Sequence, residues 1–319
     1  MSNFELKPET IAFKKRYSMV ERYQTPISLI ENTIKYRELE TSGLMIVALS
    51  GSGKSRMTEY VRESNEYPYC AHKDHKFGIY VEAPGTSMSG FLTAILTALG
   101  DPKPSFGDLD SQKSRIITLI GELDVKVVFL DEIQVILPSS GLLPTSKVVK
   151  ILKELINKTS AAWVLMGTPE AAELIEVDTQ LKDRFNRLVT IPAFGCCSNE
   201  DALDFIEYLF DILESFPRKL PYFTCLNESL VEGEICYIDS VNYDNLLRFC
   251  LATNGKARGI ANLLMECVEQ TAENKAVTRS VLSSAFNSRF KNDANVEIDP
   301  FTASIKKVKD ELKKRGLYA

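Results

Sequence analysis

Short apolar runs alternate with helical patterns through the first two thirds of the chain. Each run is rich in Val, Ile, Leu or aromatic residues and has no polar face, as a strand covered by helices on both sides requires. The runs are Leu44–Leu49, Phe77–Val81, Val125–Leu130, Ala162–Met166 and Leu188–Ile191. The helical patterns between and after them are Arg56–Glu63, Met88–Leu99, Ser111–Leu123, Lys147–Asn157 and Pro169–Glu176. The alternation predicts an α/β fold with a five-stranded parallel sheet.

After Pro192 the pattern becomes wholly helical. Helical spacing recurs in Asn199–Glu214, Tyr243–Thr253, Ala257–Ala272 and Thr278–Phe290, with a turn-rich stretch around residues 215–240. An amphipathic stretch, Ile27–Tyr36, precedes the first apolar run. The sequence therefore predicts four segments: an N-terminal arm or helix at 1–42, an α/β core at 43–195, an α-helical domain at 196–290 and a basic C-terminal tail at 291–319.

Composition narrows the protein class. The chain has 319 residues, of which 45% are hydrophobic and 25% charged, as in an ordinary globular protein. No apolar stretch is long enough to span a membrane, and the N-terminus lacks the pattern of a signal peptide, so we expect a cytoplasmic protein without a membrane partner. The net charge of −5 gives no overall signal for nucleic acid. Any DNA contact would need a local basic patch. The C-terminal stretch Thr302–Ala319 offers one, although such a charge run is more often a solvated helix face.

A glycine-rich turn follows the first apolar run. The segment Ala48-Leu-Ser-Gly-Ser-Gly-Lys-Ser55 has the order of a P-loop, in which a strand leads through the turn into a helix. Its backbone N–H groups would surround the phosphates of ATP, Lys54 would contact the β- and γ-phosphates, and the Ser55 hydroxyl would ligate Mg²⁺. The predicted cofactors are ATP and Mg²⁺. The predicted nucleotide-binding residues here are Ala48, Ser50, Gly51, Ser52, Gly53, Lys54 and Ser55, with Ala48 standing where the usual pattern has glycine.

Two acids end the third apolar run. In Val127-Val-Phe-Leu-Asp131-Glu132, the carboxylate of Asp131 would hold the Mg²⁺ shell through water. Glu132 would orient and polarise the attacking water as a general base. A strand ending in two acids is common on protein surfaces, but after a P-loop it indicates an ATPase. For Gln134, two residues further on, a plain polar loop residue is favoured over a contact with phosphate or with a neighbour.

The following segments resemble a known family. Trp163-Val-Leu-Met-Gly-Thr-Pro-Glu-Ala171 and Asp178-Thr-Gln-Leu-Lys-Asp-Arg-Phe185 are similar to motifs of AAA+ ATPases, in particular the TniB/TnsC family of transposition regulators. The resemblance covers roughly residues 20–290. It implies an AAA+ P-loop NTPase with a five-stranded parallel sheet core and a C-terminal α-helical lid domain.

The resemblance also implies roles for single residues. Thr168 stands where a sensor-1 residue contacts the γ-phosphate or the attacking water, and Arg184 matches the arginine finger that reaches the ATP of a neighbouring subunit. Arg187 is the rival candidate for the finger. In Gly255-Lys-Ala-Arg258-Gly-Ile-Ala261, Arg258 matches a sensor-2 arginine that reaches the nucleotide in cis. Ordinary surface or buried arginines remain the alternative in each case.

The implied function is regulation of DNA transposition in a bacterial cytoplasm, at the nucleoid when on DNA. Such proteins assemble with ATP as homo-oligomeric rings or filaments on target duplex DNA, recruit a DDE-type transposase with a target-selector protein, and disassemble on hydrolysis. Two alternatives remain: a helicase-loader or initiator-like AAA+ ATPase, and an AAA+ switch acting on protein alone. The candidate DNA contacts are Lys103, Lys113, Lys147, Lys150 and Lys153. A zinc site at Cys70, His72 and His75 is less favoured than a solvated loop, because no fourth ligand is near.

Overall fold

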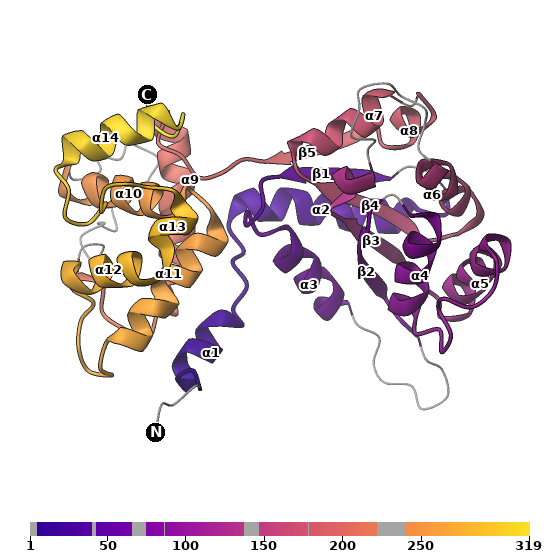
Figure 1. Cartoon of the computed structure of the whole chain (residues 1–319), viewed down its shortest axis with the longest axis horizontal. Coiled ribbons are helices and arrows are strands. Elements are labelled where there is room, and N and C mark those ends of the chain that lie inside the picture. The colour runs from indigo at the N-terminus through magenta and orange to yellow at the C-terminus, as the bar shows by residue number, and fades with distance from the viewer. Residues whose placement is uncertain are drawn as a thin grey trace. The chain divides into compact units, whose positions relative to one another are not determined.

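The protein folds into two compact units. The structure, a computed structural model, describes residues 5–39, 43–65, 75–85, 87–136, 147–177, 179–221 and 240–319. One unit is the continuous segment Arg22–Pro192, and the other combines Met1–Glu21 with Ala193–Ala319 (Figure 1). This division differs from the four predicted segments, because the predicted arm at 1–42 is shared between the two units and the tail at 291–319 is part of the second.

The unit Arg22–Pro192, hereafter the sheet unit, contains the predicted five-stranded parallel sheet. Its strands lie in the order β2-β3-β4-β1-β5, and every pairing is parallel. The strands are β1 (Leu44–Ala48), β2 (Gly78–Glu82), β3 (Val127–Asp131), β4 (Ala162–Gly167) and β5 (Arg187–Ile191). Each lies within two residues of its predicted position, so the prediction of the sheet is confirmed.

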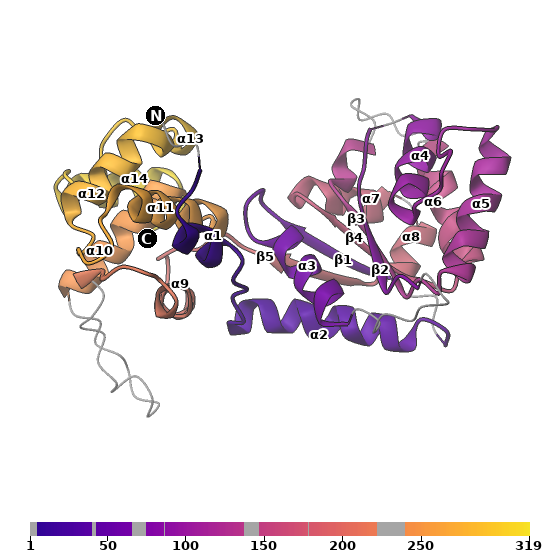
Figure 2. The same ribbon diagram turned by 90° about the horizontal axis from the view of Figure 1, so that it is seen from below.

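Burial explains why the strands are apolar throughout. Every residue of β1, β3 and β4 is buried, whereas the edge strands β2 and β5 are buried in part. Helices cover both faces: α2 (Glu21–Tyr36) and α3 (Lys54–Ser64) lie on one side, and α4 (Met88–Leu99), α5 (Leu109–Glu122) and α6 (Lys147–Lys158) on the other (Figure 2). Each fully buried large apolar side chain contributes about 1.5–3 kcal/mol to stability, so a sheet covered on both faces selects apolar runs.

Short elements follow the strands that carry the predicted motifs. The 3₁₀ helix η1 (Ile133–Ile136) comes directly after β3 and Glu132. After β4, the chain forms the 3₁₀ helix η2 (Pro169–Ala172), the helix α7 (Glu173–Val177) and the helix α8 (Thr179–Arg184). Because parallel strands point the same way, η1 and η2 begin at the carboxyl edge of the sheet. The chain then leads back through α7 and α8 to the amino edge, where the carbonyl oxygen of Arg184 accepts from the N–H of Gly43, just before β1, at 2.7 Å.

The second unit, hereafter the helical unit, is built around an aromatic cluster. Its helices are α1 (Pro8–Lys14), α9 (Asn199–Glu214), α10 (Ser240–Thr253), α11 (Ala257–Gln270), α12 (Arg279–Ala285), the π-helix η5 (Phe286–Phe290), α13 (Lys291–Ala294) and α14 (Ile305–Lys314). The ring of Phe194 stacks on Phe205 and Tyr208 of α9, with centroids 5.0 and 4.6 Å apart. Ser198 begins α9 with a reciprocal capping box to Asp201, a device typically worth about 1 kcal/mol.

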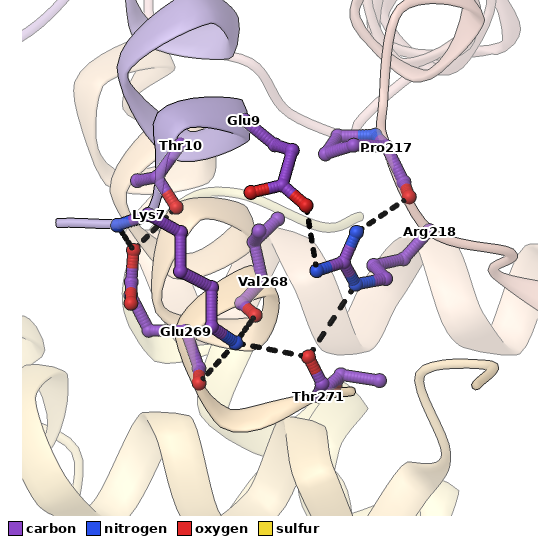
Figure 3. Close-up of polar contacts among 8 residues, drawn as sticks. All are labelled: Lys7, Glu9, Thr10, Pro217, Arg218, Val268, Glu269 and Thr271. Atoms are coloured by element: carbon purple, nitrogen blue, oxygen red, sulfur yellow. Dashed lines mark hydrogen bonds and ion pairs between the residues drawn. The ribbon is translucent and has the colours of Figure 1, made fainter. Parts of the chain in front are cut away.

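Polar contacts fasten α1 to the end of α11 (Figure 3). The ammonium of Lys7 donates to the carbonyl oxygens of Val268, Glu269 and Thr271 at 2.7–3.0 Å. These carbonyls belong to the helix C-terminus, where the backbone lacks partners and a positive charge is favourable. Arg218, whose side chain is only 2% exposed, forms an ion pair with Glu9 at 3.4 Å. The helix α1 lies within the predicted arm or helix at 1–42, for which the sequence pattern gave no separate bounds at Pro8–Lys14.

The basic C-terminal segment is folded onto the helical unit. Val308 and Leu312 of α14 are fully buried, whereas most of its lysines face solvent. The ammonium groups of Lys309 and Lys313 lie 5.6 and 5.5 Å from the ring centroid of Tyr318. No helix in the described part of the chain has the length and apolar character needed to cross a bilayer.

Candidate functional site

The glycine-rich turn joins β1 to α3 as predicted. Gly51 and Gly53 have φ angles of 86° and 101°, a left-handed region that residues with a Cβ rarely adopt. Lys54 is 5% exposed. Its ammonium donates to the carbonyl oxygen of Ala48 at 2.6 Å and to that of Leu49 at 3.4 Å, so it is held against the start of the turn.

Tyr23 of α2 supports this turn from outside the predicted motif. Its hydroxyl donates to the carbonyl oxygen of Ser52 at 3.0 Å in a buried hydrogen bond. A Cβ on Gly53 would lie 3.0 Å from the same hydroxyl, so the glycine is needed for space as well as for its φ angle. The sequence analysis missed Tyr23, because nothing in the amphipathic pattern of α2 distinguishes it from an ordinary core residue.

Three oxygen atoms from β2, β3 and α3 converge beside the turn. The Ser55 hydroxyl donates to Oδ2 of Asp131 at 3.3 Å, and the Tyr80 hydroxyl donates to the same oxygen at 2.6 Å. Burial, reinforced by the hydrogen bond to this carboxylate, raises the pKa of Tyr80 above its ordinary range, so its hydroxyl stays protonated and donates. The structure thus brings together the two predicted magnesium ligands, Ser55 and Asp131. It adds Tyr80, which sequence reasoning missed.

The carboxylates of Asp131, the last residue of β3, and of Glu132, which follows it, have different hydrogen-bond partners. Glu132 has a left-handed φ of 55°, and its N–H donates to Oδ1 of Asp131 at 2.8 Å. The carboxylate of Glu132 accepts a hydrogen bond from the amide of Gln134. The carbonyl oxygen of the same amide accepts from the N–H of Thr168 at 3.2 Å. Glu132 and Thr168, predicted from separate motifs, are therefore joined through Gln134.

The segment that contains Arg184 is amphipathic. Its apolar residues Leu181 and Phe185 are buried at 0% and 1% exposure, whereas Lys182 and Asp183 are exposed. Arg184 is half-buried, and its Nη1 is shielded without a hydrogen-bond partner among the described residues. The rival candidate Arg187 lies outside this helix, because α8 ends at Arg184 and Arg187 begins β5, where it pairs with Leu44.

Arg258 belongs to the helical unit, whereas the other predicted site residues belong to the sheet unit. It is exposed in the first turn of α11. The preceding Gly255 has a φ of 63°, and a Cβ there would lie 1.9 Å from the carbonyl oxygen of Phe194. This segment therefore has a structural requirement of its own, and the sensor-2 role of Arg258 stays a prediction.

The residues of the less favoured zinc site lie mostly outside the described part of the chain. Cys70 and His72 lie outside the described residues, and His75 is inside them. Among the described residues, no group of three His, Cys, Asp or Glu side chains is arranged to hold a metal ion.

The residues of the turn fit a bound nucleoside triphosphate with Mg²⁺. The left-handed Gly51 and Gly53 form a turn of the kind that surrounds phosphates, and Lys54 supplies a buried positive charge. The Ser52 hydroxyl is buried and has no hydrogen-bond partner among the described residues, so it is available to bond with a ligand. Ser55 and Asp131 offer the hard oxygen atoms that Mg²⁺ prefers.

Solved structures of similar fold include ORC and Cdc6 proteins. The ORC2 protein of Aeropyrum pernix, in ADPNP–ADP complexes, is 13% identical over 90% of this chain and 70% of that chain, with a TM-score of 0.57. Cdc6p of Pyrobaculum aerophilum is 11% identical over 96% and 83%, with a TM-score of 0.55. The ORC1 protein of A. pernix, solved in complex with DNA, is 16% identical over 97% and 87%, also with a TM-score of 0.55. At these identities the likeness shows the fold alone, an AAA+ P-loop α/β fold with a helical domain, as predicted.

Sequence comparison gives the family. No curated protein matches the chain significantly. The family described as bacterial TniB protein matches residues 10–194, more than half of the chain. That range includes the glycine-rich turn, the two acids after β3 and Thr168 with Arg184. The resemblance seen in the sequence is confirmed, and the chain belongs to the TniB family.

Proposed function

We propose that this protein is a Mg²⁺-dependent ATPase that assembles on duplex DNA in its ATP-bound form and regulates transposition. The observation that carries the ATPase part is the hydrogen bond between Ser55 and Asp131 at 3.3 Å. It joins the glycine-rich turn after β1 to the acids after β3, across the intervening strand β4. Membership of the TniB family supports the transposition part.

Each site residue has a chemical role in the proposed hydrolysis. ATP supplies the scissile phosphoanhydride, and Mg²⁺ offsets the charge on its phosphate oxygens. The ammonium of Lys54 binds the β- and γ-phosphates, while Ser55 and Asp131 hold the ion directly and through water. Glu132 accepts a proton from the attacking water, and Thr168 contacts the γ-phosphate or that water.

Two arginines complete the site in this proposal. Arg184 acts on the ATP of a neighbouring subunit, where a guanidinium neutralises charge that develops on the γ-phosphoryl group. The shielded Nη1 of Arg184, which lacks a partner among the described residues, is consistent with a contact made only on assembly. Arg258 contacts the nucleotide of its own subunit. The site is then complete only in a homo-oligomer, as a ring or a filament.

The candidate lysines for DNA contact differ in exposure and in ion pairing. Lys113 forms ion pairs with Asp110 and Glu154, both at 2.8 Å, so its charge is already compensated. Lys147 and Lys150 are exposed on the first turn of α6. We propose these two as the main phosphate contacts.

The lysines Lys103 and Lys153 remain weaker candidates for DNA contact. Lys103 is exposed on the loop between α4 and α5, and Lys153 donates to Gln180 at 3.1 Å. The proposed partners are target duplex DNA, a DDE-type transposase and a target-selector protein. The proposed location is the bacterial cytoplasm, at the nucleoid when the protein is on DNA.

An initiator-like function is the second candidate. The observation in its favour is the fold shared with the archaeal ORC and Cdc6 proteins, one of them solved in complex with DNA. In that case the partner would be a replicative helicase rather than a transposase. A switch that acts on protein alone would need no DNA at all.

The substitution Glu132→Gln tests the proposal, because it keeps the side-chain size and removes the base. We expect the variant to bind ATP and to accumulate as ATP-bound oligomers on duplex DNA. Wild-type hydrolysis by this variant would contradict the role of Glu132. Assembly that is indifferent to DNA would contradict the transposition function and favour a protein-only switch.

Purified partners then separate the two DNA-linked functions. A transposase encoded beside this protein should be retained on the Glu132→Gln oligomers with ATP and DNA. Retention of a replicative helicase instead of the transposase would favour the initiator-like function. Lys150→Glu should weaken DNA binding and reduce its salt dependence, whereas Lys306→Glu, an exposed lysine of the helical unit, should not.

A further inference from the structure

The side chain of Gln134 bridges two parts of the candidate site. Its Nε2 donates to Oε2 of Glu132 at 2.5 Å, and its Oε1 accepts from the backbone N–H of Thr168 at 3.2 Å. The chemistry of the partners fixes the orientation of the amide: a carboxylate accepts and a backbone N–H donates, so neither bond survives if the amide is turned over. One side chain thus uses both ends of its amide.

A glycine at the end of β4 leaves room for the side chain of Gln134. A Cβ on Gly167, the last residue of β4, would lie 2.5 Å from Oε1 of Gln134. A glycine is therefore needed at the end of β4 for the amide to reach Thr168. Ile133 and Ile136 are fully buried and hold η1 in place beneath the bridge.

The bridge also limits how the Glu132 carboxylate can move. Its backbone is fixed by the left-handed φ of 55° and by the hydrogen bond to Asp131 at 2.8 Å. The amide of Gln134 then holds Oε2, so the remaining oxygen, Oε1, is the one placed to accept a proton. A free glutamate side chain would lose up to about 2 kcal/mol of rotamer entropy on being fixed in one geometry. The bridge removes part of that cost before ATP binds.

We propose that Gln134 is a positioning residue for hydrolysis, which holds Glu132 for proton transfer and couples it to Thr168. This inference rests on the proposed function, because it requires Glu132 to be the base. It reverses the interpretation of Gln134 as a plain polar loop residue. A shift of the Thr168 backbone on contact with the γ-phosphate would be transmitted through the amide to the carboxylate of Glu132.

The substitution Gln134→Met tests the bridge, because it keeps the side-chain length and removes both hydrogen bonds. We expect kcat for ATP hydrolysis to fall by about 10- to 100-fold, the range that misplacement of a catalytic group produces. The ATP dissociation constant, measured by calorimetry with Mg²⁺, should change less than two-fold. Val135→Ala is the matched control, since Val135 is on the same short helix but is exposed to solvent.

A second variant breaks one end of the bridge only. Gln134→Glu keeps an oxygen for the N–H of Thr168 but places a carboxylate against Glu132. Its kcat should fall at least as far as that of Gln134→Met. It also keeps the test decisive if Gln134→Met fails to fold.

A double-mutant comparison separates this inference from the proposed function. If Gln134 acts through Glu132, then Glu132→Gln and Glu132→Gln/Gln134→Met should have equal residual activity, because effects through one group do not add. A further loss in the double variant would overturn the positioning role, as would a wild-type or raised kcat in Gln134→Met. Wild-type hydrolysis by Glu132→Gln would instead overturn the proposed function itself.

Discussion

The hydroxyl of Tyr23 donates a buried hydrogen bond to the carbonyl oxygen of Ser52, at 3.0 Å. This contact joins a helix that precedes the sheet to the turn expected to surround the phosphates of ATP. The conformation of the turn therefore depends on a residue well outside the motif by which it is detected. The first prediction follows from this contact.

Tyr23→Phe should weaken ATP binding about five-fold. The substitution removes a hydrogen bond worth about 1 kcal/mol and leaves the ring in place. Calorimetric titration with ATP and Mg²⁺ measures the effect. Tyr36→Phe, near the other end of α2 and 39% exposed, is the control and should leave the affinity unchanged. Equal affinities for the two variants would show that Tyr23 is only a core residue.

Lys54→Ala should abolish ATP binding without unfolding the protein. The ammonium supplies the positive charge at the phosphates, and its hydrogen bonds to Ala48 and Leu49 are local. A thermal melt without nucleotide should match that of the wild type, and added ATP should raise Tm only in the wild type. ATP affinity retained in the variant would refute the assignment of the nucleotide site.

Tyr80→Phe should raise the Mg²⁺ concentration needed for half-maximal ATPase activity several-fold. The hydroxyl holds Oδ2 of Asp131 at 2.6 Å, and without it the carboxylate is less well ordered for the ion. ATP binding measured in EDTA should be unaffected. An unchanged Mg²⁺ dependence would mean that Asp131 is oriented by its other contacts alone.

Mixing Arg184→Ala with Glu132→Gln should restore ATPase activity. Each variant is inactive alone, but in a mixed oligomer some interfaces pair an intact Glu132 with an intact Arg184 of the neighbour. The experiment is run with duplex DNA, and crosslinking verifies that mixed oligomers form. Absence of recovery at every ratio would exclude an action of Arg184 in trans, and the same mixture with Arg187→Ala would then test the rival arginine.

Gly255→Ala should destabilise the helical unit by about 2–4 kcal/mol. The added Cβ would meet the carbonyl oxygen of Phe194 at 1.9 Å, in addition to the strain of a φ of 63°. Gly316→Ala is a close control, because Gly316 has a φ of 67° with nothing within 4 Å of its Cβ. Chemical denaturation of the two variants should show the larger loss at Gly255. Equal losses would show that the backbone angle alone matters.

Local patterns predicted most of the fold. The strands were predictable because a fully covered parallel sheet demands runs such as Met45–Ala48 with no polar face. The nucleotide motifs were predictable for the same local reason, since their chemistry lies in consecutive residues. The helix α9 was predicted at its observed bounds from its helical spacing, and the structure shows that Ser198 caps its start.

Long-range contacts were beyond this reasoning. Tyr23, Tyr80 and Gln134 reach the site only after folding, and each is chemically unremarkable within its own segment. Pattern analysis likewise missed that Leu181 and Phe185 are buried, because α8 is too short for its periodicity to stand out. The packing of α1 on α11 depends on hydrogen bonds between residues more than two hundred positions apart, such as the bond from Lys7 to Glu269.

The attachment of α1 to the helical unit has a consequence for the order in which the protein folds. The helix α1 is translated before the sheet unit, but its partners Arg218 and Glu269 are translated only after the whole of Arg22–Pro192. The sheet unit is continuous in sequence and can fold on the ribosome before α1 has its contact partners. The last step is then the docking of α1 onto α11 and Arg218, which follows the folding of the sheet unit.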